Sequence, residues 1–195
     1  MRPKEERHQA QGFTIIELLL AIAIAGIVMA SFYAVYMSQQ SSYLRQEEVA
    51  AMNQNIRSAL FHMGREIRMA GLDPTGAANA GIQPDSNAST IHFTEDIRGQ
   101  NENDPPDGDT GDPNEDITYS LTDKDSDGDT DLVRNNRLIA QNISSLVFNY
   151  LDGTGNSVET PSAIRFVEVT VKAVTANGSS GRTVTSRILC RNLEY

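Results

Sequence analysis

The stretch that decides the fold is residues 12–36, which read GFTIIELLLAIAIAGIVMASFYAVY. From Leu18 to Tyr36 there are nineteen residues without a charge, and Ser31 is the one strongly polar residue among them. At a rise of about 1.5 Å per residue this segment would form about 28 Å of helix, which is close to the roughly 30 Å of a bilayer core. We therefore predict a membrane-spanning helix over residues 13–36. The alternative, a buried core helix, is disfavoured because nineteen uncharged residues would dominate the core of a 195-residue chain.

A short polar segment, residues 1–12, precedes the apolar one and is predicted to be a leader peptide. Its basic residues predict that this end stays in the cytoplasm, which places the bulk of the chain in the periplasm of a Gram-negative cell. A secretory signal would have its cleavage site after the apolar run. Here the sharpest change in composition lies before it, at Gly12-Phe13, where the small glycine gives a peptidase access to the backbone at the membrane face.

Glu17 is a single carboxylate at the start of the predicted membrane helix, where a charge costs on the order of a few kcal/mol. Cleavage after Gly12 would give Phe13 a new amino group, which could pair with Glu17 of a neighbouring chain. Because such a pair is poorly screened in apolar surroundings, it would fix the axial register of helices that pack side by side. The alternative places Glu17 among lipid headgroups without a partner.

The stretch from Gly12 to Leu20 resembles the class III signal of type IV pilins and of type II secretion pseudopilins. The resemblance implies that a prepilin peptidase cuts after Gly12, that Phe13 becomes N-methylated, and that Glu17 guides assembly with other major and minor pilins. It also implies a single-pass inner-membrane protein before assembly and a subunit of a surface pilus (a fimbrium) afterwards.

Two later stretches, residues 65–74 (REIRMAGLDP) and 142–152 (NISSLVFNYLD), are similar to minor pilins of the PilW type, and the second also to the J-type minor pseudopilin. The resemblance implies a subunit that helps to start the pilus and sits at or near its tip. A minor pseudopilin of type II secretion is the alternative, because both classes share the N-terminus. One departure is that no proline occurs between Pro3 and Pro74, whereas many pilins carry one inside the apolar helix.

The helical pattern continues beyond the predicted span, since apolar residues recur at spacings of three and four, at Val49, Met52, Ile56, Leu60, Met63 and Ile67. Gly71 and Pro74 then signal the end of the helix. We therefore expect one helix from Phe13 to Ala70, with an amphipathic half over residues 37–71.

Strand patterns follow in residues 72–195, which we expect to form a periplasmic or extracellular β-sheet domain. Apolar and polar residues alternate over 167–172 and 184–191, and the turn-forming residues 176–181 between them predict a β-hairpin. Further strands are predicted at 117–121, 132–134 and 146–150. The fold class is therefore α+β, with the long helix packed against an antiparallel sheet and an acidic loop insertion. The single cysteine, Cys190, falls on the apolar side of its strand and is predicted to be a buried, inert thiol.

The acidic residues are concentrated in residues 95–131, which hold fourteen Asp and Glu against Arg98 and Lys124, in a chain with a net charge of -10. Within residues 123–131, aspartates alternate around Gly128 as in the first nine positions of an EF-hand loop, at Asp123, Asp125, Asp127, Asp129 and Asp131. Position twelve is Arg134 instead of a bidentate glutamate, and the flanks are strand-like. We predict a Ca²⁺ site in an EF-like loop, because hard oxygen ligands suit this ion; a solvated acidic turn is the alternative.

Residues 95–116 are a second acidic stretch, rich in Pro, Gly, Asn and Asp, and are predicted to form an exposed loop. The loop could donate a ligand to the same ion, bind a second ion, or contact partners, so a calcium-dependent tip adhesin is an alternative function. The negative net charge argues against nucleic-acid binding. We do not expect an enzyme, because no catalytic motif surrounds His62 or His92.

Overall fold

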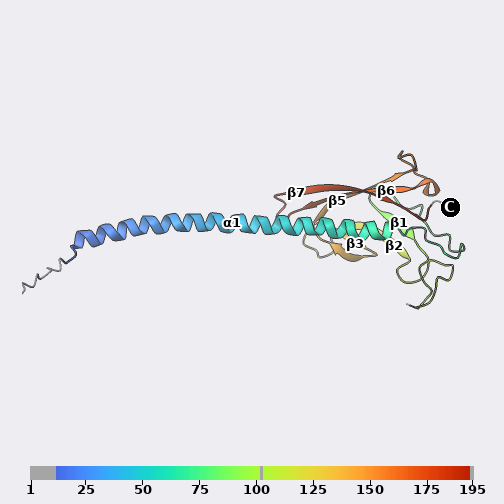
Figure 1. The fold of residues 1–195 in the computed structure, drawn as a ribbon, viewed down its shortest axis with the longest axis horizontal. Helices are drawn as coiled ribbons and strands as arrows, with labels where there is room; N and C mark the ends of the chain where they lie inside the picture. The colour runs from blue at the N-terminus through green and yellow to red at the C-terminus, as the bar shows by residue number, and fades with distance from the viewer. Residues whose placement is uncertain (1–11, 102, 194–195) are drawn as a thin grey trace, which may run out of the picture. The chain divides into compact units, whose positions relative to one another are not determined.

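The structure is a computed structural model that describes residues 12–101 and 103–193. Within these residues one long helix, α1 (Ile15–Ile67), precedes all the strands (Figure 1). The strands are β1 (Ile91–Thr94), β2 (Asp116–Thr122), β3 (Asp131–Arg134), β4 (Arg137–Ala140), β5 (Ile143–Leu151), β6 (Phe166–Val174) and β7 (Gly181–Leu189), with the short 3₁₀ helix η1 (Pro161–Ala163) before β6. The predicted α+β class is confirmed.

Helix α1 ends three residues earlier than predicted, at Ile67. The backbone then tightens, since Met69 N donates to Glu66 O at 2.8 Å and Ala70 N donates to Ile67 O at 3.3 Å. Gly71 follows with a φ of 80°, the left-handed conformation that commonly terminates helices. The left-handed conformation favours glycine here, and a Cβ, 2.5 Å from Leu193 Cδ2, would force the Leu193 side chain to move.

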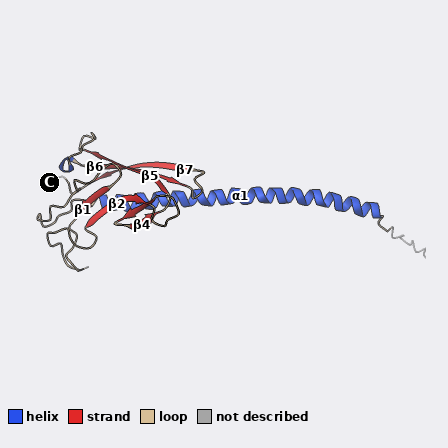
Figure 2. Ribbon diagram, turned by 180° about the vertical axis from the view of Figure 1, so that it is seen from behind, coloured by secondary structure: helices blue, strands red, loops and turns tan. Residues whose placement is uncertain are grey.

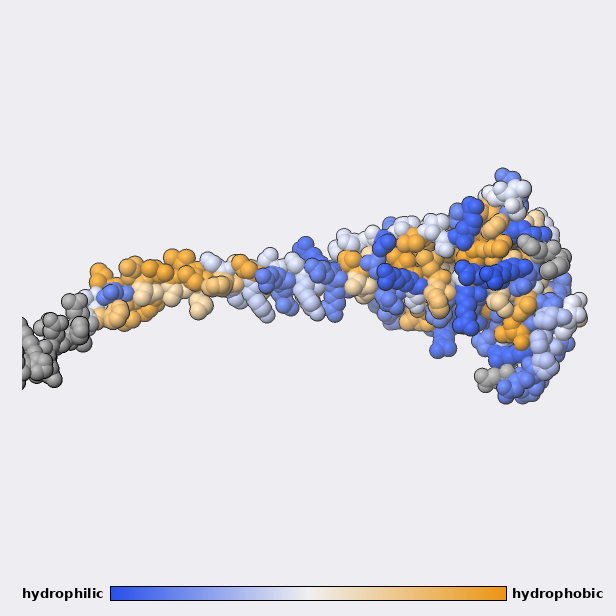
Figure 3. Space-filling model, viewed as in Figure 1, coloured by the Kyte–Doolittle hydropathy of each residue, from blue (hydrophilic) through white to orange (hydrophobic). Residues whose placement is uncertain are grey.

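The chain divides into two compact units, one ending at Gln46 and the other beginning at Glu47. The described part of the first unit is the N-terminal part of α1 with the three residues before it, and all of its residues are exposed. Figure 3 shows apolar residues clustered along this part of the helix. The second unit contains the remainder of α1 and all the described strands.

The strands form two antiparallel sheets, β1-β2-β3-β4 and β5-β6-β7, in place of the single sheet that we expected. The predicted hairpin is confirmed as β6 and β7, which pair from Phe166↔Leu189 to Val174↔Gly181. The sheets separate at Asn142, whose φ of 57° turns the chain between β4 and β5. This left-handed conformation redirects the backbone, so that β5 continues into the second sheet.

The core of the second unit lies between α1 and the two sheets, and strands of both sheets lie along the C-terminal part of the helix (Figure 2). The buried face of α1 consists of Met52, Ile56, Ala59, Met63 and Ile67. Two residues of the predicted apolar stripe are not fully buried: Val49 is 38% exposed, and Leu60 is only partly buried. Ala59, which the predicted stripe did not include, is fully buried. Cys190 is fully buried as predicted, and burial raises the pKa of its thiol to about 12, although the charge of Arg165 opposes the shift.

Candidate functional site

The predicted processing segment lies at the exposed start of α1. Phe13 is 85% exposed, and a Cβ placed on Gly12 would meet no atom within 4 Å. The peptide bond between these two residues is therefore open to an approaching enzyme. The rest of the predicted leader, residues 1–11, lies outside the described residues.

Glu17 lies in the exposed first turn of α1. Its backbone N donates to Thr14 Oγ1 at 3.3 Å, so Thr14 caps the helix. A carboxylate in the first turn is favourable, because the N-terminal end of a helix carries partial positive charge. Sequence analysis missed this cap, although Thr14 and Glu17 have the three-residue spacing that marks helix N-termini.

The first half of α1 presents a continuous apolar surface. None of its most hydrophobic stretch is buried, and by length and composition this helix is long and apolar enough to cross a membrane. Such a surface is far larger than the apolar patches of soluble monomers. Ser31 adds no unpaired polar group, since its Oγ donates to Ile27 O at 3.0 Å. This half of the helix therefore requires an apolar environment, either a bilayer or other helices.

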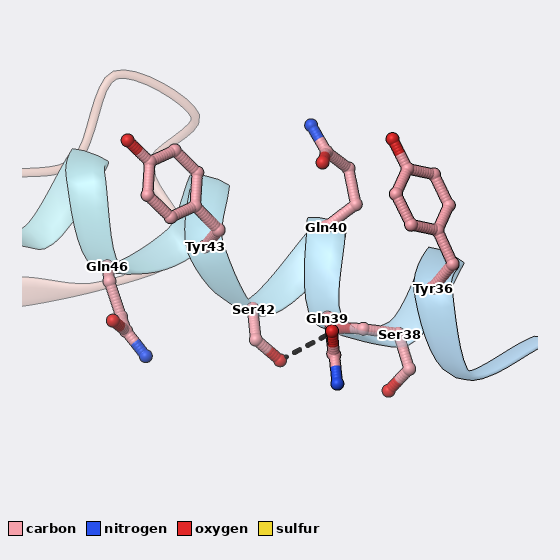
Figure 4. A pocket seen from close by; sticks show the side chains of 7 residues that line it. All are labelled: Tyr36, Ser38, Gln39, Gln40, Ser42, Tyr43 and Gln46. Atoms are coloured by element: carbon pink, nitrogen blue, oxygen red, sulfur yellow. Dashed lines mark hydrogen bonds between the residues drawn. The ribbon is translucent and has the colours of Figure 1, made fainter.

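A polar belt follows this apolar surface on α1. Tyr36, Gln40 and Tyr43 point to the same side of the helix (Figure 4). On the other side of the same turns Ser42 Oγ donates to Ser38 O at 3.0 Å, which keeps the hydroxyl bonded to the helix itself. Tyrosines next to an apolar helix are typical of a membrane–water interface, because their rings are amphipathic. The belt marks the place where α1 would leave an apolar environment.

Comparison with known families identifies residues 7–33 as a prokaryotic N-terminal methylation motif. The motif indicates a type IV pilin-like, or prepilin-type, protein. The motif covers both Gly12-Phe13 and Glu17, and it implies processing by a prepilin peptidase and assembly with other pilins. No curated protein and no solved structure gives a significant match to the chain. The apolar helix and the motif together fit a protein anchored in the inner membrane.

The EF-like loop connects β2 to β3, whose ends pair at Thr122↔Asp131. Three of the five predicted ligands come together, since carboxylate oxygens of Asp123, Asp125 and Asp131 lie within 4.8 Å of one another. Calcium binds oxygens at about 2.3–2.6 Å, so three oxygens at this spacing can share one ion. Asp131 is only 1% exposed, which makes it the fixed member of the group.

The backbone of this loop is held by the aspartates themselves. Asp123 accepts from Ser126 N at 2.7 Å and from Gly128 N at 3.2 Å. Gly128 has a φ of 95° and occupies the place of the EF-hand glycine, where the chain turns sharply. Asp127 and Asp129 stand apart from the group of three, and Asp127 Oδ1 accepts from Asp129 N at 2.9 Å.

The second acidic stretch is not the fully exposed loop that sequence analysis predicted, because both of its ends are buried. Glu95 is 5% exposed, and Asp96 and Glu115 are fully buried. The pairing of β1 with β2 brings these ends together, and Glu95 N donates to Glu115 O at 2.9 Å. The expectation failed because pairing between distant strands leaves no mark in local composition.

Glu66 connects α1 to the first sheet. One of its oxygens, Oε2, accepts from Tyr119 Oη at 2.6 Å and from Arg134 Nε at 2.8 Å. Burial raises the pKa of Tyr119, and both the hydrogen bond to Glu66 and its charge add to the rise. The phenol therefore remains a donor throughout the physiological range, which keeps this connection intact.

The two histidines outside the leader lie at different places. His62 is exposed on α1. His92, in β1, lies between two carboxylates, with Nδ1 2.8 Å from Asp85 and Nε2 2.9 Å from Asp116. The contacts of His92 therefore connect β1 both to the start of β2 and to the loop before β1.

Glu95 gives the protein a predicted dependence of stability on pH. Burial raises the pKa of Glu95 to about 7, the charges of Glu66 and Glu115 add to the rise, and Arg134 opposes it. The ordinary value is 4.5, so the folded state binds this proton more tightly than the unfolded state. Stability should therefore fall as the pH rises from about 4.5 to 7, by up to about 3 kcal/mol.

Urea unfolding of the full chain in detergent micelles, without calcium, would measure this dependence. Glu95→Gln should flatten the fall between pH 4.5 and 7 and should be more stable than the wild type at pH 8. Glu159→Gln, at an exposed site, serves as the control and should follow the wild type. Parallel curves for Glu95→Gln and the wild type would contradict the assignment.

Proposed function

We propose that this pilin-like protein is a minor pilin of a type IV pilus, of the PilW type, which acts in the complex that starts the pilus and remains at or near its tip. The observation that carries the proposal is the fully exposed apolar half of α1, most of which lies within the methylation motif. A surface of this kind suits a bilayer first and a bundle of like helices afterwards. The second unit would lie in the periplasm before assembly and at the cell surface after it.

Assembly would depend on Glu17. After cleavage at Gly12-Phe13, the new amino group of Phe13 would pair with Glu17 of the neighbouring subunit. Glu17 lies one turn from Phe13, on an exposed part of the helix, so neither group needs a change in fold to reach a neighbour. In apolar surroundings the pair would set the axial register, since an unpaired charge there is strongly disfavoured.

Replacing Glu17 with leucine should therefore reduce the amount of this protein in sheared filaments by about tenfold or more, because the amino group of Phe13 loses its partner. The amount in the membrane and the cleavage of the leader should stay unchanged. Immunoblots of filament and membrane fractions would measure both. Glu47→Gln, at an exposed position of the same helix, is the matched control. If Glu17→Leu reached the filaments in the same amount as the wild type, the proposal would be contradicted. If the wild-type protein were recovered only with a secretion pseudopilus, the result would favour the type II secretion alternative.

We also propose that the EF-like loop binds a structural Ca²⁺ through Asp123, Asp125 and Asp131, with Asp127 and Asp129 adding negative charge. The support is the spacing of the three carboxylates. Bound calcium would turn the mutual repulsion of the five aspartates into an ordered turn between β2 and β3.

Calcium at about one hundred times its dissociation constant should raise the melting temperature of the full chain in detergent micelles by about 5 °C or more. The double variant Asp123→Asn/Asp125→Asn should lose a part of this rise, since both side chains are exposed and their replacement spares the core. Differential scanning calorimetry with CaCl₂ and with EDTA would measure the change. An equal rise in the double variant and the wild type would contradict a site in this loop.

A further inference from the structure

A second group of carboxylates lies in the loop that joins β1 to β2. Oxygens of Asp107, Asp109 and Asp112 lie within 4.8 Å of one another. Asp107 and Asp109 are exposed, whereas Asp112 is 9% exposed. The group shares no residue with the EF-like loop, so it requires a separate explanation.

The buried member of this group has an unsatisfied oxygen. Asp112 Oδ2 is buried and has no hydrogen-bond partner among the described residues. Leaving a buried acceptor without a partner is costly, and more so for a charged group. The carboxylates of Asp107, Asp109 and Glu115 all place negative charge near Asp112. A cation at this point would satisfy the oxygen and offset the repulsion together.

The positive charge of Arg98 acts on Asp112 but opposes three negative charges, so it offsets only a part of them. Arg98 is the one Lys or Arg between residues 95 and 116. Its Nε donates to Pro113 O at 3.1 Å, and its Nη2 donates to the same carbonyl. The guanidinium is therefore engaged with the backbone of the loop, and the three aspartates keep their net negative charge.

Two further buried carboxylates hold the base of the loop and leave one oxygen each without a partner. Glu115 Oε1 accepts from Ile97 N at 2.8 Å and from Arg98 N at 2.9 Å, while Oε2 is buried and unpaired among the described residues. Asp96 Oδ2 accepts from Gly108 N at 3.1 Å, while Oδ1 is buried and unpaired. Both residues are fully buried. The loop thus lies over an excess of buried negative charge.

We propose that Asp107, Asp109 and Asp112 form a second divalent-cation site, which binds Ca²⁺ and fixes the loop between β1 and β2. Carboxylate oxygens are hard ligands that suit Ca²⁺, and the group contains no histidine or cysteine that would favour zinc. The exposed Asp107 and Asp109 would bind the ion at the surface, and the buried Asp112 would anchor it to the protein. Waters would complete the coordination shell, as is usual for this ion.

The test is the number of calcium ions bound per chain, measured by equilibrium dialysis with ⁴⁵Ca²⁺ on the full chain in detergent micelles. Asp107→Asn/Asp109→Asn should bind one ion fewer than the wild type. Both side chains are exposed, so the fold should persist, and circular dichroism would verify this. The control Asp104→Asn/Glu159→Gln removes the same charge at two other exposed positions and should bind as many ions as the wild type.

The EF-like loop is tested separately with Asp123→Asn/Asp125→Asn. Loss of one ion in Asp107→Asn/Asp109→Asn supports the second site whether or not the EF-like loop binds calcium. An unchanged number of ions and unchanged affinity in this variant would overturn the proposal. An equal loss in the charge-matched control would also overturn it, because the effect would then come from general electrostatic attraction.

Discussion

The Gly12→Leu variant should accumulate in the membrane as an uncut precursor. The methylation motif implies cleavage by a prepilin peptidase, and we place the cut between Gly12 and Phe13. A leucine side chain at Gly12 would meet no other part of the described chain, because a Cβ there has no neighbour within 4 Å. Any loss of cleavage would therefore arise in the peptidase complex, where a side chain blocks access to the backbone. Intact mass spectrometry of the purified protein would distinguish the precursor from a mature chain that begins at a methylated Phe13.

Gly26→Leu provides the matched control for this experiment. Gly26 lies within the apolar part of α1, and a Cβ there also has no neighbour within 4 Å. The same change in size and hydrophobicity should leave cleavage complete, since Gly26 is remote from the scissile bond. Normal processing of Gly12→Leu would defeat the assignment of the cleavage site.

The N-terminal third of the protein could be predicted well from the sequence, because its signals are local. An uncharged run long enough to span a bilayer and a periodic apolar stripe predicted one continuous helix, and α1 is that helix. The buried residues Met52, Ile56, Met63 and Ile67 all belong to the predicted stripe. Alternation of apolar and polar residues likewise predicted β5, β6 and β7, because this signal is local to one strand, and shorter strands were predicted at the positions of β2 and β3.

Features that depend on distant parts of the chain escaped prediction. Strand β4 has no alternation of its own, and it pairs with β3 through a turn at Asn135 and Asn136, with φ values of 47° and 65°. Two asparagines in the left-handed conformation are typical of a tight hairpin turn, so a signal was present. The burial of Asp96 and Glu115 had none, because it results from the pairing of β1 with β2 across a long acidic loop.

The candidate calcium loop shows the same division between local and distant signals. The local signal, aspartates that alternate around Gly128, predicted the position of the loop in the sequence. That Asp123, Asp125 and Asp131 come together depends on the pairing of β2 with β3, because Asp131 is the first residue of β3 and is buried there. Its two oxygens accept from Lys124 N at 3.1 Å and from Asn142 N at 3.2 Å. Asn142 also marks the boundary between the two sheets, so the geometry of the loop follows from the tertiary fold.

Replacing Arg134 with alanine should lower the free energy of unfolding by about 2–3 kcal/mol. The side chains of Arg134 and Glu66 are only 16% and 24% exposed, and Nε lies 2.8 Å from Oε2. Removal of the guanidinium leaves a half-buried carboxylate with the Tyr119 hydroxyl as its remaining partner. Glu95 adds to the effect, because the charge of Arg134 also lowers the pKa of that buried carboxyl. Urea unfolding of the full chain in detergent micelles at pH 7.5 would measure the loss.

A double-mutant cycle separates the ion pair from the packing of the arginine stem. Glu66→Gln removes the charge of the acceptor and keeps its shape, so Arg134→Ala in that background should cost clearly less than in the wild type. Arg187→Ala is the matched control, since Arg187 pairs with Glu168 at 3.4 Å while its side chain is 53% exposed, and exposed pairs contribute about 0–1 kcal/mol. Equal costs for Arg134→Ala in both backgrounds would mean that the charge of Glu66 has no part in joining the helix to the first sheet. A reduced cost would show that the helix is held to the sheet by a charged contact as well as by the apolar face of Met63 and Ile67.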